Sequence, residues 1–93
     1  MSPDIEAHIR KIQTSVSSPE RYIAALRVLW SEIEKWKASS GKGYSFTSDS
    51  VVNYYRAAAP IEHSADPEVI EGIMAVKGEF AICNGQMILS LII

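Results

Sequence analysis

The chain of 93 residues has a single cysteine, Cys83. One thiol cannot form an internal disulfide, which is typical of proteins in the reducing cytosol. Long apolar runs are also missing, because none approaches the ~20 residues that cross a bilayer. The N-terminal segment MSPDIEAHIRKIQ is charged and lacks the apolar centre of a signal peptide. These absences predict a cytoplasmic protein that does not contact membranes.

The sequence also lacks an excess of positive charge. Its formal net charge is −2 and its pI is about 5.6, whereas nucleic-acid-binding domains are usually basic, so we expect no nucleic-acid partner. Residues 1–43 carry seven Lys or Arg and five Asp or Glu, while residues 44–93 carry two and six. This imbalance predicts either solvated helix faces or an acidic surface for a basic partner protein.

Sequence motifs for cofactors and metals are missing as well. The segment SSGKGYS lacks the first glycine of a phosphate-binding loop, because Trp36 stands five residues before Gly41. Glu62, His63 and Asp66 lie close together, but no second Cys or His follows at the spacing of metal ligands. We therefore expect neither a cofactor nor a bound metal.

Four segments have helical patterns of apolar residues and helix-start signals. Serine or aspartate followed by proline opens three of them, since the first two favour the N-cap and proline the first turn. The predicted helices span about 3–16, 19–39, 50–59 and 66–77, the last ending at Gly78. Residues 50–59 also have high strand propensity, so a strand is the alternative there.

The last segment, EFAICNGQMILSLII, predicts a β-hairpin. Asn84-Gly85 between apolar runs is the dipeptide that a type I′ turn prefers. The fold class is therefore expected to be α+β: three to four helices followed by a C-terminal antiparallel hairpin, in one small domain of residues 1–93. A short strand at Tyr44–Phe46, or a second copy joined through Ile88, Ser90 and Ile92, would cover the exposed edge.

The segment SDSVVNYYRAAAPIEHSADPEVIEGI is similar in layout to colicin DNase immunity proteins, which are small acidic four-helix inhibitors. That family carries an Asp and a Tyr-Tyr pair on a short third helix, before a fourth helix that starts with proline. The resemblance implies that Asp49, Tyr54 and Tyr55 contact a basic nuclease. Two features depart from the family: the proline after the third helix is displaced to Pro60, and the predicted hairpin has no counterpart.

The shorter segment DSVV resembles acyl carrier proteins, which bear a prosthetic group on a serine at the head of a helix. The match implies that role for Ser50, although Ser48 and Val51 replace the usual neighbours. An ordinary helix cap explains the same residues. A second chemical alternative is a nucleophilic Cys83 activated by His63, which requires the two to be in contact.

Three functions follow in order of preference. The first is a small cytosolic protein-protein interaction module, such as an inhibitor, an immunity-type protein or an adaptor. It would bind a basic partner through an acidic and tyrosine-rich surface formed by Asp49, Tyr54, Tyr55, Glu62 and Asp66. The second is a subunit of a homo-oligomer assembled through the C-terminal strand. The third is a small enzyme or carrier domain. An alternative for the tyrosines is that one packs in the core and the other covers its edge.

Overall fold

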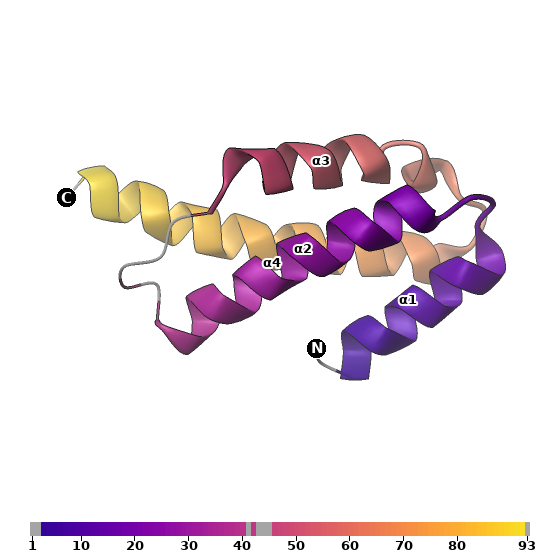
Figure 1. Ribbon diagram of the computed structural model, residues 1–93, viewed down its shortest axis with the longest axis horizontal. Helices are drawn as coiled ribbons and strands as arrows, with labels where there is room; N and C mark the ends of the chain where they lie inside the picture. The colour runs from indigo at the N-terminus through magenta and orange to yellow at the C-terminus, as the bar shows by residue number, and fades with distance from the viewer. Residues whose placement is uncertain (1–2, 41, 43–45, 93) are drawn as a thin grey trace.

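The computed structural model describes the backbone of residues 3–40, 42 and 46–92, and the side chains of residues 5–40, 42 and 46–83. It contains α1 (Pro3–Ser15), α2 (Glu20–Ala38), α3 (Ser48–Ala58), the 3₁₀ turn η1 (Ile61–His63) and α4 (Pro67–Ile92). Successive helices run in opposite directions, giving an up-down-up-down bundle (Figure 1). α2 packs on both α3 and α4, and α1 packs on α4.

The predicted α+β class is wrong, because no strand occurs in the part of the chain that the structure describes. The C-terminal hairpin is absent, and α4 continues without a break through Asn84-Gly85 to Ile92. Tyr44 and Ser45 of the predicted short strand lie outside the described residues, and Phe46 is not in a strand. Phe46 instead meets Phe80 of α4 edge to face, with ring centroids 5.3 Å apart.

The C-terminal segment is helical because its apolar residues also fit a helical repeat. Val69, Ile73, Val76, Phe80 and Cys83 are all buried, at spacings of four, three, four and three residues. A helix satisfies its own backbone hydrogen bonds, whereas an isolated hairpin is marginal in water. Burial of Phe80 and Cys83 outweighs the cost of about 1 kcal/mol for the helical glycine at position 78, so α4 does not end there.

The other predicted helices are confirmed, with small shifts at their ends. Residues 50–59 are helical rather than extended, and α3 begins slightly earlier, at Ser48. Asp66 caps α4 as expected, because its Oδ1 accepts the Glu68 N–H at 3.0 Å. Gly41, the predicted glycine at the end of α2, lies outside the described residues. Ser40 adopts the left-handed conformation there, with φ of 55°.

Among the described side chains, Glu32 is the charged one that is buried. It is 8% exposed, and its Oε1 accepts both the backbone N–H and the hydroxyl of Thr47, at 3.2 and 3.1 Å. Thr47 is the N-cap of α3, yet its own side chain makes no cap hydrogen bond. The carboxylate of α2 therefore fixes where α3 begins, and this contact joins the two helices beside their apolar interface.

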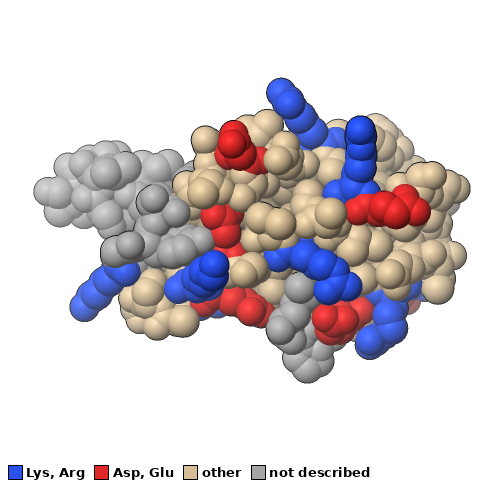
Figure 2. Space-filling view, in the orientation of Figure 1, with Lys and Arg blue, Asp and Glu red and all other residues tan. Residues whose placement is uncertain are grey.

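The charge imbalance between the two halves of the sequence is partly offset by ion pairs that join the two halves. Lys11 of α1 pairs with Asp66 and Glu68, and Lys37 of α2 pairs with Glu79. The bases of the first half thus neutralise acids of the second half across the bundle. Figure 2 accordingly shows basic and acidic side chains interspersed on the face that it draws.

A protein that crosses a membrane through a helix needs one that is long and apolar enough to span the bilayer. None of the helices within the described ranges is both long enough and apolar enough to span a bilayer.

Candidate functional site

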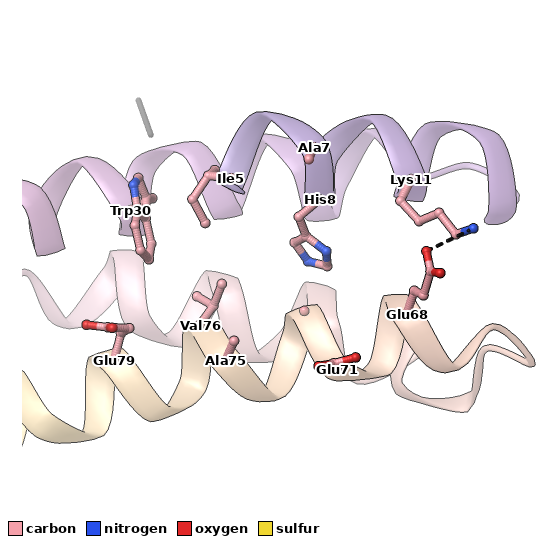
Figure 3. Close-up of a pocket in the computed structure, with 11 residues that line it drawn as sticks. Ile5, Ala7, His8, Lys11, Trp30, Glu68, Glu71, Ala75, Val76 and Glu79 are labelled. Carbon is pink, nitrogen blue, oxygen red and sulfur yellow. Dashed lines mark ion pairs between the residues drawn. The ribbon is translucent and has the colours of Figure 1, made fainter. Parts of the chain in front are cut away.

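A groove of about 420 Å³ lies between α1 and α4, with Trp30 of α2 at one end. Its floor is apolar, formed by Ile5, Trp30 and Val76, and small residues at Ala7 and Ala75 leave it hollow. Figure 3 shows His8 pointing from α1 towards α4 in the middle of this groove. The volume falls within the range of about 300–1,000 Å³ found for ligand sites.

Gly72 allows α1 and α4 to approach at the middle of the groove. A Cβ atom built at this position would overlap the imidazole ring of His8. The glycine therefore costs helix propensity, about 1 kcal/mol relative to alanine, and provides the space in which the ring lies. Gly78, on the same helix, faces open space and has no such role.

His8 connects the groove to the core through two tyrosines. The Tyr22 hydroxyl lies 3.3 Å from Nε2 of His8 and 3.2 Å from the Tyr54 hydroxyl. Both tyrosines are buried, and burial raises the pKa of Tyr22 to about 12 and also raises the pKa of Tyr54. The three side chains join α1, α2 and α3 by polar contacts inside an apolar core, where an unpaired hydroxyl would be costly.

Carboxylates of α4 form one rim of the groove. Glu68, Glu71 and Glu79 line it against a single lysine, Lys11. Glu68 pairs with Lys11 at 3.2 Å, as the dashed line in Figure 3 shows, and Glu79 pairs with Lys37 at 2.9 Å. Glu71 is exposed and has no ion pair with any described side chain. The groove therefore combines an apolar floor with an acidic rim on which two carboxylates are paired and that of Glu71 is not.

The environment of His8 predicts a pH-dependent stability. Burial lowers the pKa of His8 below its ordinary value. Below about pH 6.5 the unfolded chain thus binds a proton that the folded protein does not. The stabilisation by neutral His8 is present above that pH and is lost as pH falls through the lowered pKa. We expect the urea midpoint to fall between about pH 7.5 and 5 less steeply in His8→Gln than in the unmodified protein.

His63→Gln is the matched control for this measurement, because His63 is exposed on η1. It should keep the pH slope of the unmodified protein. Parallel curves for all three proteins would contradict the role given to His8. The carboxyl of Asp66 does not contribute to the change of stability over this pH range. Although desolvation opposes the shift, the Glu68 N–H, the Ser15 hydroxyl and Lys11 hold the pKa of its carboxyl below the usual value.

The residues predicted to form an acidic and tyrosine-rich surface are partly dispersed. Tyr54 is 0% exposed and lies in the core, whereas Tyr55 is 38% exposed and rests on Phe80 at the edge of it. The positions of Tyr54 and Tyr55 therefore agree with the alternative interpretation, in which one tyrosine packs in the core and the other covers its edge. Asp49 and Tyr55 share an exposed stripe of α3 with Val52, at spacings of three residues.

Glu62 and Asp66 both have partners within the chain. Glu62 pairs with Lys77, whose ammonium also lies 5.5 Å from the centre of the Tyr55 ring. Asp66 caps α4, and its Oδ2 accepts the Ser15 hydroxyl at 3.0 Å. Both carboxylates thus hold helices together, and neither lies beside Asp49 on the exposed stripe of α3.

The residues predicted to join two copies are Ile88, Ser90 and Ile92. Their backbone belongs to α4, so the strand edge that was to pair them does not exist. Their side chains lie outside the described residues. Further back on α4, Met74 and Ile82 are each 62% exposed, with Gly78 on the same line of the helix between them.

The structure does not bring the predicted reactive groups together. Cys83 is buried, while His63 is exposed and makes no hydrogen bond with it. Burial, followed by the charge of Glu79, raises the pKa of the Cys83 thiol, which opposes formation of a thiolate nucleophile. The Ser50 hydroxyl contacts the Thr47 hydroxyl in the first turn of α3. Among the side chains that are described, no three acids, histidines or cysteines gather where they could hold a metal ion.

The groove was not found from the sequence, because its residues come from three helices. The available signals were Gly72 inside an otherwise regular apolar helix and the spacing of Glu68, Glu71 and Glu79. The first indicates a close helix approach, and the second places three carboxylates on one side of a helix. Compared with protein-family models, curated proteins and solved structures, the chain matches none.

Proposed function

We propose that this chain is a small protein-binding module that holds a basic, amphipathic segment of another protein in the groove between α1 and α4. The observation that carries the proposal is the apolar floor of Ile5, Trp30 and Val76 beside the unpaired carboxylate of Glu71. The aliphatic stem of a lysine or arginine would cover the floor while its charged head meets Glu71. The net charge of −2 favours the approach of such a partner.

Titration with designed helical peptides tests this proposal. The first probe is a synthetic amphipathic helix of leucine and lysine, and the second has glutamate in place of every lysine. We expect the lysine peptide alone to shift the backbone NMR signals of Ala7, Glu71 and Ala75. Glu71→Lys should weaken its binding by about tenfold or more, because a repulsive charge replaces an attractive one.

Asp49→Lys is the matched control, since it makes the same change of charge on the exposed stripe of α3. It should change the affinity by less than about twofold. The reverse result, with Asp49→Lys damaging and Glu71→Lys harmless, would move the binding surface to α3 and overturn the groove. If the glutamate peptide binds as tightly as the lysine peptide, the proposal that the partner is basic is wrong.

Self-association is a second proposal, supported by the exposed apolar stripe of Met74 and Ile82 on α4. Gly78 between them leaves open space where a second helix can approach closely. Sedimentation of the protein alone distinguishes the two proposals. A concentration-dependent dimer that Met74→Lys dissociates supports association of two copies, and a monomer at all concentrations rejects it.

A further inference from the structure

A second cleft, larger than the groove, lies on another side of the bundle. Its volume is about 540 Å³. It is bounded by the turn between α1 and α2, by the first turn of α2, and by the last turns of α3. Its apolar lining residues are Val16, Tyr22, Ala57 and Ile61, of which Val16 and Ala57 are half-buried and the other two buried. The cleft therefore has an apolar wall on which the body of a small molecule can rest.

The charged residues of this cleft are two arginines, Arg21 of α2 and Arg56 of α3. None of the acidic side chains that the structure describes lines it, although the chain as a whole is acidic. Neither guanidinium has an ion pair with a described residue, whereas the bases around the other groove are paired with glutamates. An anion bound in the cleft would offer both guanidiniums a charged hydrogen-bond acceptor.

The neutral lining supplies further hydrogen-bond donors. Ser17 and Ser18 lie in the turn before α2, and Asn53 stands one turn before Arg56 on α3. Each guanidinium has five N–H donors in a planar fork that fits phosphate oxygens in pairs. The set of two guanidiniums, two hydroxyls and an amide exceeds what the two oxygens of a carboxylate can accept. It suits the three terminal oxygens of a phosphate group.

We infer that the cleft formed by Arg21, Arg56, Ser17, Ser18 and Asn53 is a binding site for a dianionic phosphate group, either free or carried by a small molecule whose apolar part lies against the half-buried Val16 and Ala57. The site lies apart from the groove between α1 and α4, because no residue lines both. It does not depend on the proposed binding of a basic protein segment, and the two can be tested separately.

NMR titration of the full chain tests the site with three probes: inorganic phosphate, phenyl phosphate and benzoate. At about pH 7.5 the dianion is the main form of both phosphates. They should shift the backbone signals of Ser17, Ser18 and Asn53, and benzoate should bind at least about tenfold more weakly. Tighter binding of phenyl phosphate would identify a phosphate ester as the ligand. Equal binding of the two phosphates would identify the free ion, and both results support the phosphate site.

The variants Arg21→Gln and Arg56→Gln should each weaken phosphate binding by about tenfold, and the double variant should abolish it. Arg10→Gln is the matched control, because Arg10 is exposed on α1, has no ion pair with a described residue and does not line the cleft. It should leave the affinity unchanged, and circular dichroism checks that every variant is folded. Unchanged phosphate binding in the double variant, or equally tight binding of benzoate, would overturn the inference.

Discussion

Gly72→Ala is expected to destabilise the protein by about 1–3 kcal/mol, although alanine is the better helix former. The added methyl group would occupy the position of the His8 imidazole. To make room, the ring must leave the space between α1 and α4, and the Tyr22 hydroxyl then loses its contact with Nε2. In the background of His8→Ala the obstacle is gone. There the same substitution should stabilise the protein by up to about 1 kcal/mol.

Urea unfolding of the unmodified protein, Gly72→Ala, His8→Ala and the double variant measures whether the effect of Gly72→Ala on stability changes sign when His8 is removed. Gly78→Ala is the matched control on the same helix, because a Cβ there meets open space. It should stabilise the protein by about 0.5–1 kcal/mol in both backgrounds. If Gly72→Ala stabilises the protein as Gly78→Ala does while His8 is present, then the imidazole does not fill the space between α1 and α4. The position given to His8 in the groove would then be wrong.

Tyr54→Ala is expected to cost about 3–5 kcal/mol, the range for removing a large buried aromatic side chain. A domain of this length typically has a free energy of unfolding of about 5–14 kcal/mol, so much of the stability would be lost. The ring of Tyr54 packs against Tyr22 and Tyr55, with centroids 5.6 and 5.7 Å away. Thermal and urea unfolding measure the loss directly.

Two milder variants divide this loss into its parts. One separates the contribution of the Tyr54 ring from that of its hydroxyl, and the other compares the buried tyrosine with the exposed one. Tyr54→Phe keeps the ring and should cost about 1 kcal/mol, since Tyr22 still has His8 as a partner. Tyr55→Ala removes a partly exposed ring and should cost less than Tyr54→Ala. If Tyr54→Ala unfolds no more easily than Tyr55→Ala, Tyr54 is not in the core. Tests of a binding surface on α3 should therefore use Tyr55, because a change at Tyr54 confounds binding with folding.

Local signals in the sequence predicted where helices begin more reliably than where the last one ends. Asp66-Pro67 starts α4 as expected, since an N-cap and a first-turn proline act within a few residues. Asn84-Gly85 is an equally local signal for a turn, yet the chain there is helical. The buried stripe from Val69 to Cys83 belongs to a helix that packs on α1, α2 and η1. Its contacts with distant helices are tertiary information that a dipeptide does not contain.

The candidate sites were less predictable than the fold, for a related reason. Asp49 and Tyr55 do share an exposed stripe, because both belong to one short helix. Glu62 and Asp66, by contrast, pair with lysines of other helices, Lys77 of α4 and Lys11 of α1. Charge and residue type alone could not show that these carboxylates stabilise helix contacts. Both clefts are likewise assembled from residues of several helices.

The groove between α1 and α4 is also the least local part of the bundle. Contacts that hold α1 to the start of α4 join residues far apart in the chain, such as Ser15 and Asp66, which are 51 positions apart, whereas Glu32 meets Thr47 over 15 positions. Closing the longer loop costs more chain entropy, so α2 and α3 are expected to associate before α1 docks. On unfolding we expect the reverse order, with α1 detaching first; hydrogen exchange that is faster in α1 than in α2 and α3 would show it.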